Sequence, residues 1–223
     1  MTADTPELAV HLSHLLLRWH VFRCRRKSDT STRFLMEIAR CVAQAPRGPD
    51  VPPLLEIGTR SGGSALLMLR VLASIYGRRC RPPLVITVDP YGSRPYEGEP
   101  HVYDERHYGA MKRALARYSN HIHYMMDSEL FLRELDNLYL WSGGSKHALG
   151  RFSMVYLDGS HDPTIVWSEI ERLLPRVIPG GFLIVDDTDW FDGAVRRRLD
   201  AAAPSLGVSL RHKEKQSILH VTG

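Results

Sequence analysis

Residues 54–68, with the sequence LLEIGTRSGGSALLM, predict a buried strand, a glycine turn and the beginning of a helix. The apolar run at the start is short enough for a strand of a parallel sheet, and the residues from Ala65 onward are strong helix formers. Between them, Gly58, Gly62 and Gly63 let the backbone adopt positive φ values and let a ligand approach where a Cβ would block it. The N-terminus of the helix then points unpaired N–H groups at that ligand. The stretch therefore predicts a cofactor-binding turn, with an ordinary strand-to-helix turn as the alternative.

The spacing of these glycines excludes two common nucleotide-binding motifs. Arg60 stands in place of the middle glycine of a dinucleotide fingerprint, and no lysine follows the last glycine as a P-loop requires. Glu56 at the end of the strand and Asp89 at the end of the next apolar run form a different pattern. This pattern resembles class I S-adenosylmethionine methyltransferases. The resemblance implies that Glu56 lies near the methionine amino group of the cofactor and that Asp89 receives the ribose hydroxyls.

The composition is that of one globular α/β domain. The 223 residues are 43% hydrophobic and 24% charged, which suits a single sizeable core. The net charge of +4 is modest, and the basic runs at 23–27 and 196–198 lack interleaved aromatic residues, so we expect solvated helix faces and no nucleic-acid partner. Cys24, Cys41 and Cys80 are too few and too far apart for a disulfide framework or a metal site.

The N-terminal part of the chain predicts helices and no targeting segment. It lacks the basic region of a signal peptide, and no apolar run reaches the roughly 20 residues of a membrane span, so we expect a cytoplasmic protein without a membrane partner. Apolar residues at helical spacing over 7–45 predict two helices, and a proline-rich linker follows at 45–53. We therefore expect an N-terminal helical cap at 1–50 and an S-adenosylmethionine-binding methyltransferase domain at 51–223. The sequence leaves a homo-oligomer open.

The next segments alternate between strand and helix, which predicts a parallel sheet with right-handed crossovers. A strand at 84–88 is followed by a polar, aromatic loop at 91–103, which is either a lid over the ligands or a surface insertion. After a helix at 108–118 and a strand at 121–126 come Asp127 and Ser128. The resemblance implies that these two residues lie beside the adenine. The alternative is an N-cap for a helix that runs to residue 140, before a loop at 141–146.

Two further apolar strands end in carboxylates. One ends at Asp158 in the sequence DGSH, which also contains His161, and the other ends at Asp186 and Asp187. Because ligands of open α/β sheets bind at the carboxyl ends of the strands, these acids are expected to converge with Glu56 and Asp89. Carboxylates so close together repel one another unless a cation or a proton intervenes. Hard oxygen ligands suit Mg²⁺, with Ca²⁺ or Mn²⁺ as alternatives.

With these motifs, residues 54–189 resemble the macrocin O-methyltransferase and cephalosporin-hydroxylase-like branch of the class I methyltransferases. The resemblance implies that Asp158, Asp186 and Asp187 hold Mg²⁺ and that His161 is the general base. The alternative makes Asp158 and His161 a loop-capping pair and Asp187 a helix N-cap. The resemblance does not extend to the leading helices.

The C-terminal segment completes the expected fold. A helix at 190–203 and strands at 207–212 and 216–221 predict the antiparallel end of a Rossmann-like, mostly parallel, seven-stranded sheet with helices on both faces. Trp190 either packs at the rim or forms a wall of an acceptor pocket.

Together these features predict a metal-assisted O-methyltransferase that uses S-adenosylmethionine and acts on a hydroxyl of a small molecule such as a sugar or phenol. The alternative is a protein of the same fold that binds cofactor or a partner without methyl transfer, or that performs another reaction, such as hydroxylation-associated chemistry. The expected cofactor-binding residues are Glu56, Gly58, Thr59, Gly62, Gly63, Ser64, Asp89, Asp127 and Ser128.

Overall fold

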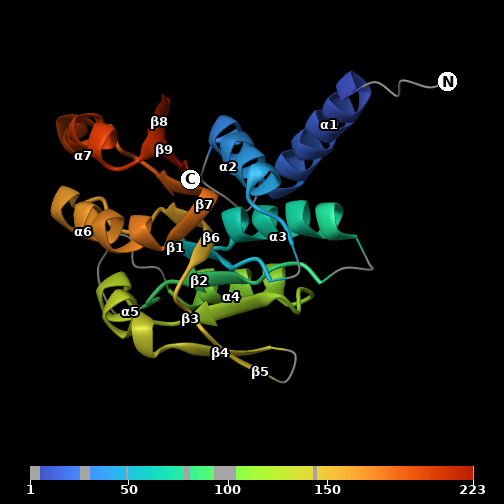
Figure 1. Ribbon diagram of the computed structural model, residues 1–223. Helices are drawn as coiled ribbons and strands as arrows, with labels where there is room; N and C mark the ends of the chain where they lie inside the picture. The colour runs from blue at the N-terminus through green and yellow to red at the C-terminus, as the bar shows by residue number, and fades with distance from the viewer. Residues whose placement is uncertain are drawn as a thin grey trace.

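The computed structural model describes residues 6–25, 31–48, 50–77, 81–92, 104–142 and 145–222, and its centre is a seven-stranded sheet (Figure 1). In spatial order the strands are β3 (His121–Tyr124), β2 (Val85–Val88), β1 (Leu54–Ile57), β6 (Phe152–Leu157), β7 (Val177–Val185), β9 (Gln216–Val221) and β8 (Val208–Lys213). The first five are parallel, and β9 is antiparallel to both of its neighbours. The predicted sheet, with its C-terminal antiparallel pair, is therefore confirmed.

Helices cover both faces of this sheet (Figure 1). Successive residues of a strand point to opposite faces, so Leu54 packs in one hydrophobic cluster and Leu55 in the other. The first cluster joins the sheet to α1 (Pro6–Cys24), α2 (Thr32–Gln44), α3 (Gly63–Tyr76) and α4 (Glu105–Leu115). The second joins it to α5 (Ser128–Glu134), α6 (Pro163–Leu173) and α7 (Trp190–Ala202). Short 3-10 turns lie at Leu135–Asn137, Leu174–Arg176 and Ala203–Ser205.

The turn between β1 and α3 requires glycine at its first position. Gly58 has a φ of 87°, and a Cβ built on it would lie 2.0 Å from the carbonyl oxygen of Asp158. Asp158 directly follows β6, and its backbone, unlike the end of a flexible side chain, cannot move aside. Gly62, with a φ of 77°, then precedes the first turn of α3. The predicted strand, turn and helix are confirmed, and the close packing brings β1 and β6 together where the site forms.

The predicted helix from Ser128 to residue 140 is wrong in its second half. Helix α5 ends at Glu134, and a separate antiparallel pair follows, formed by β4 (Tyr139–Ser142) and β5 (Ser145–Ala148). Leu140 and Leu149 are buried against the second cluster, and the Leu149 N–H bonds to the Leu138 carbonyl at 3.1 Å. This pairing over a short distance in the chain overrides the helix propensity of the segment.

The other boundaries differ less. Helix α4 begins at Glu105, three residues before its predicted start, because the Asp104 carboxylate accepts the backbone N–H groups of Arg106 and His107 at 2.9 and 3.3 Å. Cys24 and Cys41 are buried and are not joined in a disulfide, whereas Cys80 lies outside the described residues. Most of the predicted lid, residues 93–103, also lies outside them.

The two leading helices are confirmed and pack on α3 as well as on each other. The division of the chain at residue 50 stays a prediction. Within the described ranges, no helix is both long and apolar enough to cross a membrane.

Candidate active site

The carboxyl ends of β6 and β7 bring two predicted metal ligands to the same edge of the sheet. Leu157 and Val185 are partners in the parallel register, so Asp158 and Asp186 follow at the same level. The hydroxyl of Tyr156 lies 3.0 Å from Oδ2 of Asp158 and 2.5 Å from Oδ2 of Asp186. Tyr156 is fully buried and was not among the predicted site residues. Its position two residues before Asp158, on the same face of the strand, is the sequence signal that could have identified it.

This group of acids has unusual protonation equilibria. Burial is the main cause that raises the pKa of Asp158 well above its ordinary value, and the neighbouring Asp186 raises it further. Burial also raises the pKa of Asp186, with a contribution from Asp187. The pKa of the Tyr156 hydroxyl is raised for the same reason, first by burial and then by the two carboxylates. Negative charge is therefore costly at this edge, and a bound cation would reduce that cost.

Asp187 is surrounded by basic and aromatic side chains. Its Oδ1 lies 3.3 Å from Nζ of Lys215, and its Oδ2 lies 3.7 Å from Nε2 of His161. The ring of His161 packs against Trp190, with centroids 4.3 Å apart. Asp187 has a φ of 45°, which is rare for a residue with a side chain and is found at functional sites. Three segments that are distant in sequence, around His161, Asp187 and Lys215, therefore meet beside the two buried carboxylates.

The predicted metal ligands are near one another but do not form a finished cage. Within the part of the chain that the structure describes, no three His, Cys, Asp or Glu side chains are grouped closely enough to hold a metal ion. Asp158 and Asp186 share the Tyr156 hydroxyl, while Asp187 pairs with Lys215. The metal site thus stays a prediction, in a region whose donors are all carboxylate oxygens of the kind that Mg²⁺ prefers.

The alternative of Asp187 as a helix N-cap is wrong, whereas the alternative of Asp158 and His161 as a loop-capping pair is not tested by the helix caps. Asp162 caps α6, with its Oδ1 accepting the N–H groups of Thr164 and Ile165 at 2.7 and 3.3 Å. The residue at the cap position of α7 is Asp189, and its side chain makes no capping hydrogen bond. Neither Asp158 nor Asp187 occupies a helix cap position.

Glu56 lies at the end of β1 and has an unsatisfied carboxylate. The residue is fully buried, and within the described ranges neither carboxylate oxygen has a hydrogen-bond partner. Burial raises its pKa from 4.5 to about 8; the nearby hydroxyls of Ser64 and Thr59 lower it somewhat, although neither closes a hydrogen bond on the carboxylate. Buried polar groups without partners are rare in native structures and often mark a place where a ligand binds. An ammonium group is the natural partner for such a carboxylate.

Asp89 fastens the glycine turn to the end of β2. Its Oδ2 accepts the backbone N–H groups of Thr59 and Arg60 at 2.9 and 2.8 Å, and its Oδ1 accepts that of Tyr91 at 3.1 Å. The Tyr91 hydroxyl in turn donates to the Arg60 carbonyl. Burial raises the pKa of Asp89, and these backbone donors oppose that shift. Asp89 therefore has a structural role in addition to the ribose contact, which stays a prediction.

The remaining predicted cofactor residues lie at the beginnings of α3 and α5. Gly63 and Ser64 are buried in the first turn of α3. Asp127 caps α5 by accepting the N–H of Leu130 at 2.7 Å, which confirms the capping interpretation, and Ser128 is the first residue of that helix. Their contact with adenine stays a prediction. Sequence analysis missed an aromatic cluster next to Asp89, in which ring centroids lie 5.2 to 6.0 Å apart; its members are Tyr91, Tyr108 and His123.

Comparison with known proteins identifies the family and the fold of the chain. Residues 55–188, more than half of the chain, match the family model of a methyltransferase domain. No curated protein sequence matches the chain. Among solved structures, an O-methyltransferase from Bacillus cereus in complex with SAH is similar, with a TM-score of 0.57 and 15% identity over 92% of this chain and 90% of that one.

Two further structures are similar in fold. The O-methyltransferase TomG from Streptomyces achromogenes, in complex with SAM, has a TM-score of 0.54 and 20% identity over 97% of this chain and 96% of its own. The MycE methyltransferase of mycinamycin biosynthesis, in complex with Mg and SAH, has a TM-score of 0.59 and 15% identity over 93% of this chain but 53% of its own. The chain belongs to the methyltransferase domain family, with the fold of the class I S-adenosylmethionine-dependent methyltransferases.

Proposed function

We propose that the protein transfers a methyl group from S-adenosylmethionine to a hydroxyl of a small molecule, with the help of a divalent metal ion. The observation that carries this proposal is the convergence of Asp158 and Asp186 on one hydroxyl, next to Asp187 and His161. The unpartnered Glu56 carboxylate at the neighbouring strand end supports it further. A structure of MycE, which is similar in fold, contains both Mg and SAH, and this supports a metal in the proposal.

The cofactor is assigned to the turn after β1. S-adenosylmethionine carries an ammonium group that would satisfy the buried Glu56 carboxylate, and its sulfonium already makes it a good methyl donor. The backbone N–H groups at the start of α3 suit the methionine carboxylate. Asp89 is proposed to bind the ribose and Asp127 the adenine. The full set of proposed cofactor contacts is Glu56, Gly58, Thr59, Gly62, Gly63, Ser64, Asp89, Asp127 and Ser128.

The metal is assigned to Asp158, Asp186 and Asp187. These acids fit a hard divalent cation because all their donor atoms are carboxylate oxygens and because burial makes uncompensated charge costly there. Bound Mg²⁺ supplies Lewis acidity, which lowers the pKa of a coordinated hydroxyl and fixes its orientation.

His161 is proposed as the general base. Its Nε2 lies 3.7 Å from Oδ2 of Asp187, so the carboxylate stabilises the imidazolium that forms when the ring takes the acceptor's proton. Packing against Trp190 holds the plane of the imidazole, and the partly exposed Trp190 ring is proposed as one wall of the acceptor pocket. General-base catalysis of this kind contributes roughly 10²–10⁴-fold to the rate. The rest of the rate enhancement comes from holding the acceptor hydroxyl in line with the methyl group.

The acceptor is proposed to be a sugar, a phenol or another natural-product-like hydroxyl compound, and the protein to act in the cytoplasm. No nucleic-acid or membrane partner is proposed, and the question of a homo-oligomer is left open.

The test is incubation of the protein and S-adenosylmethionine with a panel of sugars, phenols and polyketide alcohols. The readouts are release of S-adenosylhomocysteine and a product heavier by one methyl group. We expect turnover with at least one class, abolished by EDTA and restored by excess Mg²⁺. Tight S-adenosylmethionine binding without transfer to any acceptor would favour the alternative of a binding protein. Full turnover in EDTA would remove the metal from the proposal.

A further inference from the structure

Resting on the proposed function, we propose that Tyr156 is a positioning residue for the metal: its hydroxyl holds the carboxylates of Asp158 and Asp186 together so that one divalent cation can bind both. The residue touches neither cofactor nor acceptor in this proposal. It acts through the two carboxylates.

The distances place the Tyr156 hydroxyl between the two carboxylates. Its hydroxyl contacts Oδ2 of Asp158 at 3.0 Å and Oδ2 of Asp186 at 2.5 Å. The two carboxylates come from different strands, yet both must lie within one hydrogen-bond length of the same atom. Asp186 is fixed at its other oxygen as well, since Oδ1 accepts the Asp187 N–H at 3.0 Å. A carboxylate oxygen has two lone pairs, so an oxygen that accepts a hydrogen bond can still bind a cation.

The Tyr156 hydroxyl contacts both carboxylates. The nearby Lys215 ammonium pairs with Asp187, and Gln216 acts on Asp186. Two buried carboxylates repel each other in the low local dielectric, so without a shared donor they would rotate apart. The hydroxyl has a single proton, which prevents this when the two Oδ2 atoms share it in a three-centre hydrogen bond. Bringing the ligands together in advance reduces the ordering that metal binding would otherwise require.

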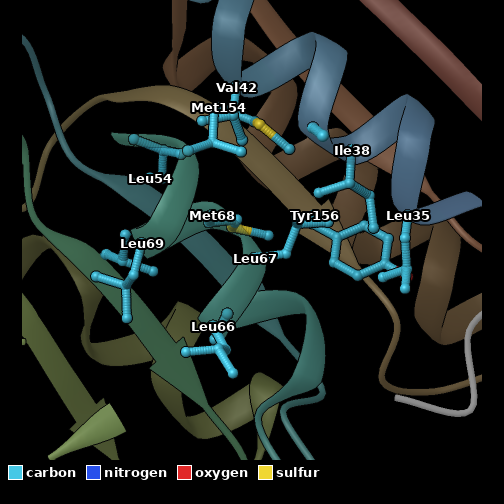
Figure 2. Close-up of a cluster of buried hydrophobic side chains, with 14 of the residues drawn as sticks. Leu35, Ile38, Val42, Leu54, Leu66, Leu67, Met68, Leu69, Met154 and Tyr156 are labelled. Carbon is cyan, nitrogen blue, oxygen red and sulfur yellow. The ribbon is translucent and has the colours of Figure 1, made fainter. Parts of the chain in front are cut away.

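The ring of Tyr156 is held so firmly that its hydroxyl cannot follow a moving carboxylate. Tyr156 is fully buried in the first hydrophobic cluster. Figure 2 shows its ring facing Leu35 and Ile38 of α2, which are completely buried members of the same cluster, with Leu67 of α3 nearby. Helix α2 lies outside the matched methyltransferase region, at 55–188. Helix α2 therefore contributes to the proposed metal site through its contact with the ring of Tyr156.

The test replaces Tyr156 by phenylalanine, which keeps the ring and removes the hydroxyl. We expect Mn²⁺ affinity, measured by electron paramagnetic resonance and calorimetry, to fall about 10-fold, within the 10–100-fold range for lost outer-sphere partners of metal ligands. Affinity for S-adenosylhomocysteine should stay unchanged. Tyr76→Phe is the matched control, because Tyr76 packs against the same cluster and its buried hydroxyl has no partner among the described residues. That control should bind Mn²⁺ as the parent does.

A donor-retaining variant separates positioning from packing. Incorporation of p-aminophenylalanine at position 156 keeps a hydrogen-bond donor on the ring and should restore most of the Mn²⁺ affinity. This variant keeps the test decisive even if the phenylalanine variant folds poorly. Mn²⁺ binding that is equally tight in the parent and in Tyr156→Phe would overturn the positioning role while leaving the metal proposal intact. If the parent itself binds no Mn²⁺, the metal part of the proposed function fails, and this inference fails with it.

Discussion

Single residues at the carboxyl edge of the sheet carry charges that the fold does not satisfy by itself. Glu56 is the clearest case, because its carboxylate is buried, has no hydrogen-bond partner among the described residues and has a pKa of about 8. The neighbouring carboxylate of Asp89 raises that pKa further. Such an arrangement destabilises the ligand-free protein and is offset when a positively charged group binds.

This cost predicts how stability depends on pH. Because the pKa of Glu56 in the folded protein lies above its ordinary value of 4.5, its contribution to stability is fully present below pH 4.5 and is lost as pH rises through about 8. Glu56→Gln removes the titration but keeps the shape. The free energy of unfolding of the parent, relative to Glu56→Gln, should therefore fall with a slope of up to about 1.4 kcal/mol per pH unit across this range.

Urea unfolding of both proteins without ligand, at several pH values between 5 and 8, checks this expectation. The other buried acids are present in both proteins, so the difference reports Glu56 together with its coupling to neighbouring acids such as Asp89 and Asp158. A difference that stays constant with pH would show that Glu56 is ionised without penalty.

His161 gives a second prediction at this scale. His161→Ala should lose most of kcat, by roughly 10²–10⁴-fold, because the acceptor proton then has no base. Binding of S-adenosylhomocysteine, measured by calorimetry, should remain as in the parent, since His161 lies on the metal side of the site. A fully active His161→Ala protein would remove the base from the proposed mechanism.

At the scale of elements, the antiparallel hairpin of β8 and β9 is fastened to the end of β7. Thr188 donates its backbone N–H and its hydroxyl to the Lys215 carbonyl at 2.8 and 2.9 Å, and its hydroxyl lies 2.8 Å from the Ser217 hydroxyl. These bonds are buried, and they keep the Lys215 ammonium beside Asp187. The hairpin is thus part of the candidate site, although it is the last part of the chain.

Thr188→Val tests this attachment. The substitution keeps the volume and removes the hydroxyl, which leaves the Ser217 hydroxyl without that partner. We expect a loss of about 1–3 kcal/mol in the free energy of unfolding, measured by urea denaturation. Ser205→Ala is a suitable control, because the Ser205 hydroxyl bonds the Ala202 carbonyl at an exposed position. Equal stability of the Thr188→Val protein and the parent would mean that the hairpin is held by the sheet alone.

The elements that sequence analysis predicted correctly are those with local signals. The glycine turn, the strands that end in carboxylates and the closing antiparallel pair follow from periodicity and turn residues within short windows. The β4–β5 pair was missed because its apolar and aromatic residues read as the end of a helix until the partner strand is known. Tyr156 and Lys215 were missed for a different reason: their contacts with Asp186 and Asp187 span 30 and 28 residues. The approach of the Tyr156 hydroxyl to Asp186 and of the Lys215 ammonium to Asp187 depends on strand order, which no local pattern encodes.

At the scale of the whole molecule, segments outside the matched domain complete the site. The family match ends at residue 188 and begins at 55, yet helix α2 packs behind Tyr156 and the β8–β9 hairpin supplies Lys215. The proposed site therefore depends on segments of the chain both before and after the matched domain. The leading helices, which the resemblance did not cover, have a role in this account beyond covering the sheet.

The most direct test of the central claim, a metal site beside the methyl donor, measures proton relaxation of the S-methyl group of S-adenosylmethionine in the presence of the protein and Mn²⁺. Paramagnetic relaxation falls off steeply with distance, so the measurement needs no knowledge of the acceptor. The account predicts strong relaxation enhancement with the parent protein and its loss in a variant that combines Asp158→Asn and Asp186→Asn, with S-adenosylmethionine still bound. Binding of S-adenosylmethionine by the parent without any Mn²⁺-dependent enhancement would contradict the account.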